Sequence, residues 1–150
     1  MARTPRIIVE AAMTPNVNGI LESALYVDDL DRAVEFYETV FGFEILTRGR
    51  RICAMGVAGR DVLLLFHKGG SVRPTRIPGG VIPPTDADGE IHLAFSVSAT
   101  ELDRWQEWLR QKSVPIESTV KWGRGGTSIY FRDPDRHLIE LVTPGTWSIY

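Results

Sequence analysis

The sequence predicts an α+β protein in which two βαβββ modules form one mixed sheet. Two observations lead to this fold class. Three segments of the first half recur, in the same order, in the second half, and each half has the pattern of a strand, a helix and three short strands. A segment rich in glycine and proline, residues 68–90, lies between the halves.

The repeat has low identity, but three matches in one order indicate a duplication. The matches pair residues 19–27 with 89–97, residues 30–32 with 102–104, and residues 57–66 with 133–142. In this alignment Glu22 falls on His92, and Leu64 falls on Glu140.

In the first half, residues 20–27 have apolar side chains on both faces, as expected of a strand in a covered sheet. Asp29 is a natural helix N-cap, and Gly42 closes the helix that follows. An apolar helical stripe runs between them through Ala33, Phe36, Tyr37 and Val40. Three strands are expected at residues 43–47, 51–57 and 62–66.

The second half repeats the pattern, beginning with a strand at residues 91–97. Ser98 and Glu101 have capping-box spacing, and the helix after them should turn Leu102, Trp105, Trp108 and Leu109 inward. The remaining strands are expected at residues 116–121, 127–132 and 138–143.

The whole chain is expected to form one compact domain. Its parts are an aperiodic N-terminal extension (1–18), a first module (19–67), the linker (68–90), a second module (91–143) and a C-terminal tail (144–150). The linker has no period and is a candidate lid. Within the extension, Met13 is an alternative start, and residues 7–9 are a candidate short edge strand.

Composition excludes several classes of protein. The chain has 150 residues and a net charge of −2, so no basic field points to nucleic acid or an anionic membrane. Hydrophobic residues make up 43% and charged residues 24%, which excludes wholesale disorder. The single cysteine, Cys53, is expected in the core, and a reducing compartment follows. With neither a membrane span nor a secretion signal, the expected location is cytoplasmic.

Three residues are candidate ligands of a divalent metal. Glu22 and Glu140 lie inside apolar strands, where an ionised carboxylate is costly unless it is paired or bound to a metal, and His92 is the repeat equivalent of Glu22. If the halves pack about a pseudo-twofold axis, the three side chains converge. Taken singly, each is more simply a paired core glutamate or a hydrogen-bonded core histidine, but their placement at equivalent positions favours the metal site, for Mn, Fe, Ni, Zn or Mg.

The other polar and aromatic candidates are less specific. Arg124, within the glycine-rich segment 122–126, either binds an anionic group of a substrate or is a solvated arginine in a hairpin turn. Candidate walls of a substrate pocket are Trp122, Tyr130, Phe66 and His67, although aromatic residues at such positions are more often core or dimer contacts. His137 follows a turn and is expected to be exposed. No phosphate-binding loop or nucleophile signature is found.

With these features the chain resembles the vicinal oxygen chelate superfamily, which includes glyoxalase I, extradiol dioxygenases, fosfomycin-resistance thiol transferases and bleomycin-binding proteins. The resemblance rests on LYVDDLDRAVEFYETVFGFEI in the first half and on HLAFSV and IYFRDPDRHLIEL in the second. It implies a cupped sheet around a divalent metal, with ligands at Glu22, His92 and Glu140. It also implies a homodimer, and we favour sites that combine Glu22 of one chain with His92 and Glu140 of the other.

The sequence departs from the family pattern at three positions. Glu22 stands where dioxygenases and fosfomycin enzymes have a histidine, so the site is harder and iron-dependent oxygen chemistry is less favoured. Leu64 replaces the fourth ligand of glyoxalases, a glutamate, and Arg136 replaces a glycine in the turn after Asp-Pro-Asp, which predicts strain there.

The resemblance implies an enzyme in which a metal chelates two adjacent oxygens of a small substrate and stabilises an anion. Lyase- or isomerase-like proton transfer is the favoured reaction, with Glu22 or Glu140 as ligand and base. The principal alternative is a metal-free binding protein of the bleomycin-resistance type. An extradiol dioxygenase and a fosfomycin-type thiol transferase are further alternatives.

Overall fold

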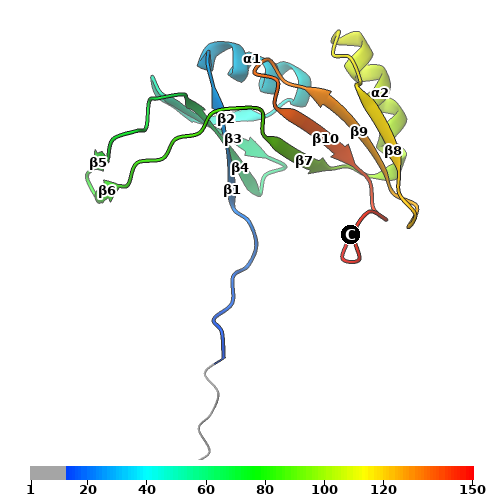
Figure 1. Cartoon of the computed structure of the whole chain (residues 1–150), viewed down its shortest axis with the longest axis horizontal. Coiled ribbons are helices and arrows are strands. Elements are labelled where there is room, and N and C mark those ends of the chain that lie inside the picture. The colour runs from blue at the N-terminus through cyan, green and yellow to red at the C-terminus, as the bar shows by residue number, and fades with distance from the viewer. Residues whose placement is uncertain (1–12) are drawn as a thin grey trace, which may run out of the picture.

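The computed structural model describes residues 13–150, so the candidate strand at residues 7–9 lies outside the described residues. Two four-stranded mixed sheets, each covered by one helix, form the body of the molecule (Figure 1). Their strand orders are β1-β4-β3-β2 and β7-β10-β9-β8. The α+β fold with two modules is therefore confirmed, but each module forms its own mixed sheet rather than part of one shared sheet. No helix among residues 13–150 is long and apolar enough to cross a membrane.

The first module has helix α1 packed on one face of its sheet. Asp29 caps the helix by accepting a hydrogen bond from the backbone N–H of Arg32, and Gly42 ends it in the left-handed conformation, as predicted. The elements are β1 (Glu22–Val27), α1 (Leu30–Phe41), β2 (Glu44–Arg48), β3 (Ile52–Val57) and β4 (Asp61–His67).

The second module repeats this order, with one local difference from the prediction. Ser98 precedes a short 3-10 turn, Ala99–Glu101, and makes no capping hydrogen bond; Glu101 pairs instead with Arg104. The predicted capping box is therefore wrong. The elements are β7 (His92–Ser96), α2 (Leu102–Gln111), β8 (Ser118–Lys121), β9 (Thr127–Arg132) and β10 (Leu138–Val142).

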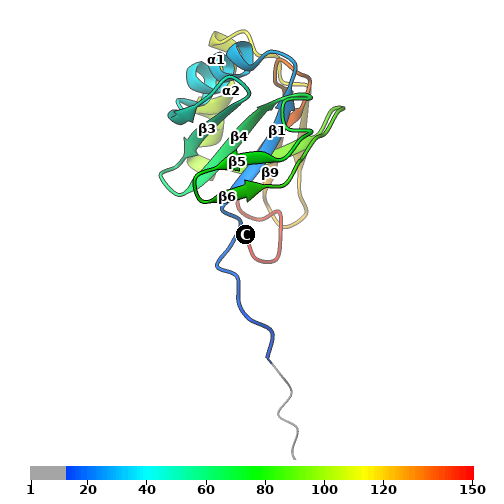
Figure 2. The same cartoon turned by 90° about the vertical axis from the view of Figure 1, so that its left-hand side faces the viewer.

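The linker contains a hairpin that the sequence did not predict. Strands β5 (Thr75–Ile77) and β6 (Gly80–Ile82) pair with each other and project from the first module, away from the second (Figures 1 and 2). The base of this arm is tied to β1, because the Tyr26 hydroxyl lies 2.5 Å from Oγ1 of Thr85. The local signal was missed because each strand has only three residues and the arm has no periodic face.

The sheet registers confirm the internal repeat. In the parallel pair β1–β4, Ala24 lies beside Leu64, and in the parallel pair β7–β10, Ala94 lies beside Glu140. Leu64 and Glu140 therefore occupy equivalent places in the two sheets, as Glu22 and His92 do.

Each sheet has one covered face and one open face. Alternate residues of the strands point to the helices and form a single core, which includes Leu65, Cys53, Phe131 and Leu141, all completely buried. Glu22 and Leu64 lie on the open face of the first sheet, whereas His92 and Glu140 lie on that of the second. The two helices are connected by a hydrogen bond of 2.8 Å from the Trp108 indole N–H to the carbonyl of Val40. Trp108 is 39% exposed, so the prediction that it points inward is wrong.

The turn Asp133–His137 joins the second module to the first. His137 is buried: its Nδ1 accepts the N–H of Ile91, so its Nε2–H donates to the carbonyl of Tyr26 on β1 at 2.8 Å. The expectation that His137 is exposed is therefore wrong. The error came from treating a turn as a surface feature, although this turn lies between two sheets.

Asp133 supports the same turn from within. Its carboxylate accepts the backbone N–H of Asp135 and that of His137, and it accepts the Tyr37 hydroxyl at 2.8 Å. Burial raises the pKa of Tyr37 well above its usual value, and the neighbouring Asp133 adds to the effect, so the phenol keeps its proton and remains a donor. Burial likewise raises the pKa of Asp133.

The predicted strain at Arg136 is present, since its φ is 65°, in the left-handed region that favours glycine. We expect Arg136→Gly to be more stable than Arg136→Ala by about 0.5–1 kcal/mol, because both lose the ion pair with Glu90 but only glycine relieves the backbone. Urea denaturation of the two variants measures this difference. Equal stabilities would show that the turn stores no strain at this residue.

Candidate metal centre

Glu140 is at the centre of the candidate site, in the middle of β10 on the open face of the second sheet. The residue is 7% exposed, and its two oxygens have different surroundings. Oε1 lies 2.5 Å from the Ser128 hydroxyl and 3.1 Å from the Tyr130 hydroxyl, whereas Oε2 lies 3.1 Å from Nε2 of His92. Burial is the largest effect on Tyr130 and raises the pKa of its hydroxyl; Ser128 lowers this pKa and Glu140 raises it, and the net increase keeps the proton on the hydroxyl.

His92 is oriented by the backbone of the same strand as Glu140. Its Nδ1 lies 2.9 Å from the carbonyl oxygen of Leu138, and because a carbonyl only accepts, Nδ1 carries the proton. In the neutral ring, Nε2 then presents its lone pair toward Oε2 of Glu140. A backbone carbonyl on the far nitrogen is the usual partner of a metal-binding histidine.

The spacing of the two facing atoms suits a metal. Ligand bonds of about 2.0–2.2 Å meeting at a right angle separate nitrogen and oxygen by about 3.0 Å, and Nε2 of His92 and Oε2 of Glu140 are 3.1 Å apart. Without a cation or a proton between them, two lone pairs at this distance repel. The pair therefore fits two adjacent positions of one divalent ion.

Glu22 does not join this pair within the chain. It is exposed at the first position of β1, and no group of three His, Cys, Asp or Glu side chains with metal-binding geometry occurs in residues 13–150. The structure thus brings together two of the three predicted ligands and leaves Glu22 on the open face of the other module.

The predicted pocket residues divide in the same way. Tyr130 contacts Glu140, and the ring of Trp122, at the end of β8, is connected to Glu140 through Ser128. Arg124 is exposed in the β8–β9 turn, and Phe66 lies in the first module, stacked on Tyr26 at 5.2 Å.

Ser128 is the residue that sequence reasoning missed. It is completely buried and donates to Glu140. Strand alternation places Ser128 on the same face of β9 as Tyr130, but only the pairing of Tyr130 with Glu140 shows that this face carries the site.

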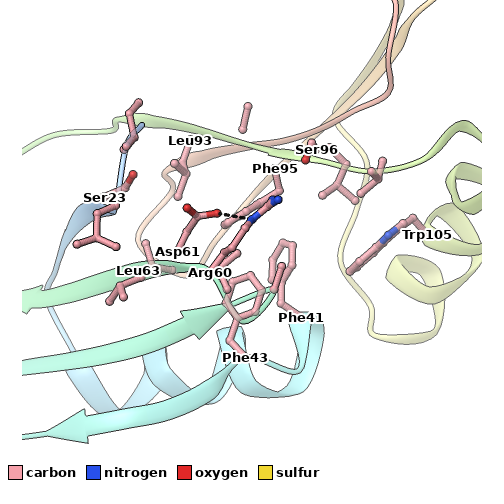
Figure 3. Close-up of a pocket in the computed structure, with 18 residues that line it drawn as sticks. Ser23, Phe41, Phe43, Arg60, Asp61, Leu63, Leu93, Phe95, Ser96 and Trp105 are labelled. Atoms are coloured by element: carbon pink, nitrogen blue, oxygen red, sulfur yellow. Dashed lines mark ion pairs between the residues drawn. The ribbon is translucent and has the colours of Figure 1, made fainter. Parts of the chain in front are cut away.

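A separate crevice of about 410 Å³ lies between the first module and residues of β7, α2 and β10 in the second (Figure 3). Aromatic rings line it, with Arg60 and Asp61 paired at 3.8 Å. None of the predicted site residues lines it. The labelled lining residues are Ser23, Phe41, Phe43, Arg60, Asp61, Leu63, Leu93, Phe95, Ser96 and Trp105.

The geometry agrees with a family model. Residues 19–141 match the model of the Glyoxalase/Bleomycin resistance protein/Dioxygenase superfamily. The chain belongs to this superfamily. The predicted resemblance is thereby confirmed.

Among curated relatives, metallothiol transferase FosB of Lysinibacillus sphaericus is 32% identical over 130 residues, which cover 85% of this chain and 82% of that protein. Among solved structures, the lactoylglutathione lyase of Agrobacterium tumefaciens superposes with a TM-score of 0.81 at 31% identity, covering 89% of this chain and 99% of the other. The fosfomycin resistance protein FosX of Listeria monocytogenes, solved with Mn(II) and sulfate, has the same fold, with a TM-score of 0.63 at 24% identity over 85% of this chain and 91% of that one.

Leu64 provides a direct test of the open face. We expect Leu64→Glu to fold and to bind a divalent metal more tightly, because this partly exposed position is equivalent to that of Glu140. The matched control is Leu65→Glu, which places the same carboxylate at a completely buried position and should unfold the protein. Circular dichroism and Mn²⁺ titration read both outcomes. A Leu64→Glu protein that is unfolded in excess metal would show that Leu64 belongs to the core.

Proposed function

We propose that the protein is a metal-dependent enzyme that transfers a thiol to a small, anionic, oxygenated substrate. Two observations together carry this choice: His92 and Glu140 are placed to bind one metal ion, and Leu64 occupies the position of the fourth glyoxalase ligand. A glyoxalase-like acid–base pair needs a second carboxylate at this corner, and leucine cannot ligate or move a proton. The similarity to metallothiol transferases supports the same choice.

His92 and Glu140 would hold the metal, and Glu22 would supply the third ligand. When bound, a divalent ion polarises substrate oxygens as a Lewis acid and neutralises the charge that develops on them. Mn, Fe, Ni, Zn and Mg all remain compatible with one nitrogen and two carboxylate ligands.

The chain's own residues would bind and orient the substrate. The exposed Arg124 is placed to pair with an anionic group, while the rings of Trp122, Tyr130 and Phe66 are proposed as the walls of the pocket. In thiol transfer a carbon–sulfur bond forms as a carbon–oxygen bond breaks, and the proton of the thiol ends on the released oxygen. No protein carboxylate has to act as a base if the thiol arrives ionised.

A proton-transfer reaction of the glyoxalase type is the second candidate. It is favoured by the structural similarity to the lactoylglutathione lyase and by the carboxylate of Glu22, which could act as ligand and base. The two candidates differ in whether a thiol is consumed.

We further propose a homodimer in which each site combines Glu22 of one chain with His92 and Glu140 of the other. Glu22 and the His92–Glu140 pair lie on different open faces of one chain, so a second copy can complete each site. The β5–β6 arm supports this assembly, because its apolar side chains are about half exposed. They are Ile77 at 49%, Val81 at 52% and Ile82 at 50%.

The activity is tested with metal-free protein, Mn²⁺, fosfomycin as a first probe, and either cysteine or glutathione. We expect uptake of about one ion per chain and loss of free thiol only when protein, metal and fosfomycin are all present. His92→Ala should abolish both, whereas Glu35→Ala, at an exposed position of α1, should abolish neither. Metal uptake without thiol loss, together with isomerisation of the glutathione–methylglyoxal adduct, would favour the second candidate, and absence of metal uptake would favour a metal-free binding protein.

The shared site is tested by mixing chains. Glu22→Ala and His92→Ala proteins are unfolded and refolded together, and Mn²⁺ binding is compared with that of each parent. In a shared-site dimer, one of the two sites in each mixed dimer regains all three ligands, so binding returns in part. If mixed dimers form and bind no more metal than the parents, the site does not combine Glu22 with His92 across chains.

A further inference from the structure

A chain of hydrogen bonds leads from Trp122 to the candidate ligand Glu140. The indole Nε1 of Trp122 lies 2.8 Å from Oγ of Ser128, and this Oγ lies 2.5 Å from Oε1 of Glu140. The Trp122 ring comes from the β8–β9 turn, whereas Ser128 is the second residue of β9, the strand that pairs with β10. The β8–β9 turn is thereby connected to the candidate ligand Glu140.

The direction of this chain is fixed by chemistry. An indole N–H only donates, so the Ser128 oxygen accepts from Trp122 and its one proton is left for Glu140. The Tyr130 hydroxyl donates to the same Oε1 at 3.1 Å. Because Ser128 is completely buried, no solvent molecule competes for its hydroxyl. Oε1 therefore receives two hydrogen bonds, and Oε2 is left facing His92.

We infer that Trp122 is a positioning residue of the metal site: acting only through Ser128, it holds Glu140 so that Oε2 alone is offered to the metal. This inference rests on the proposed metal centre and goes beyond it. Because Oε1 is committed to two donors, Glu140 occupies one coordination position instead of two. In a six-coordinate ion, three single-atom protein ligands leave three positions open, enough for the two adjacent oxygens of a chelating substrate.

The Trp122 side chain then has two separate functions, one for its ring and one for its N–H. The Trp122 ring is 38% exposed and can still form a wall of the substrate pocket, but its N–H is already used and cannot bind substrate. Trp122→Phe keeps most of the ring and removes only the donor. Ser128→Ala removes the intermediate hydroxyl, and the double variant removes both.

The experiment is a double-mutant cycle on Mn²⁺ affinity, measured by electron paramagnetic resonance of the free ion. We expect Ser128→Ala to weaken binding about 10–100-fold, the usual loss for a partner of a metal ligand, and Trp122→Phe to weaken it by less. The deciding expectation is that Trp122→Phe has no further effect in the Ser128→Ala background. Ser128→Thr, which keeps the hydroxyl, should recover most of the affinity.

Trp108→Phe is the matched control, since it removes an indole hydrogen bond of the same 2.8 Å length, to the carbonyl of Val40 between the helices. It should lower thermal stability and leave Mn²⁺ affinity unchanged. Thermal unfolding of every variant shows that the proteins compared are folded.

Two results would overturn the inference while leaving the metal centre in place. One is a Trp122→Phe protein with wild-type Mn²⁺ affinity. The other is an equal loss from Trp122→Phe in the wild-type and Ser128→Ala backgrounds, which would mean that the ring acts by packing. A wild-type protein that binds no Mn²⁺, Zn²⁺, Ni²⁺, Mg²⁺ or Fe²⁺ would instead overturn the proposed centre, and this inference with it.

Discussion

The candidate site depends on the turn Asp133–His137, which fixes the second module against the first. The sheets do not pair with each other, so their relative position comes from the shared core and from this turn. His137 gives its Nε2–H to the carbonyl of Tyr26, and Asp133 accepts the hydroxyl of Tyr37. Breaking either contact would leave a buried polar group without its partner, which costs about 1–3 kcal/mol. Since β10 begins immediately after the turn, the same contacts place Glu140.

The orientation that follows keeps the two open faces from completing a site within one chain. Both helices lie on the core side of their sheets, and Glu22 and His92 start β1 and β7, each of which is an edge strand of its sheet. The Tyr26 carbonyl of β1 already accepts a hydrogen bond from His137. A second chain is thus the simplest source of a carboxylate for the His92–Glu140 edge, which is why we place Glu22 of a partner there.

Local signals in the sequence were sufficient for most of the fold. The two ends of α1 could be predicted from Asp29 and Gly42, because side-chain capping and a positive φ are properties of single residues. The equivalence of Glu22 with His92 also came from pattern alone. The predictions that failed concern contacts between distant segments. His137 is buried because it contacts Tyr26 of β1, and Ser128 becomes important only once β9 lies beside β10. Such contacts leave no periodic trace in one sequence.

The neighbours of the equivalent positions Leu64 and Glu140 differ between the two sheets, and this difference explains why the second sheet can hold a carboxylate there. Opposite Glu140 on the neighbouring strand stands Tyr130, and the equivalent partner of Leu64 is Ala54. Ser128, the other donor to Glu140, likewise corresponds to Ile52 in the first sheet. An ionised carboxylate at the Leu64 corner would have no donor from these neighbours, whereas Glu140 has two. The ligand and its hydrogen-bond partners therefore differ together between the modules, as expected if these partners offset the cost of burying the Glu140 carboxylate in β10.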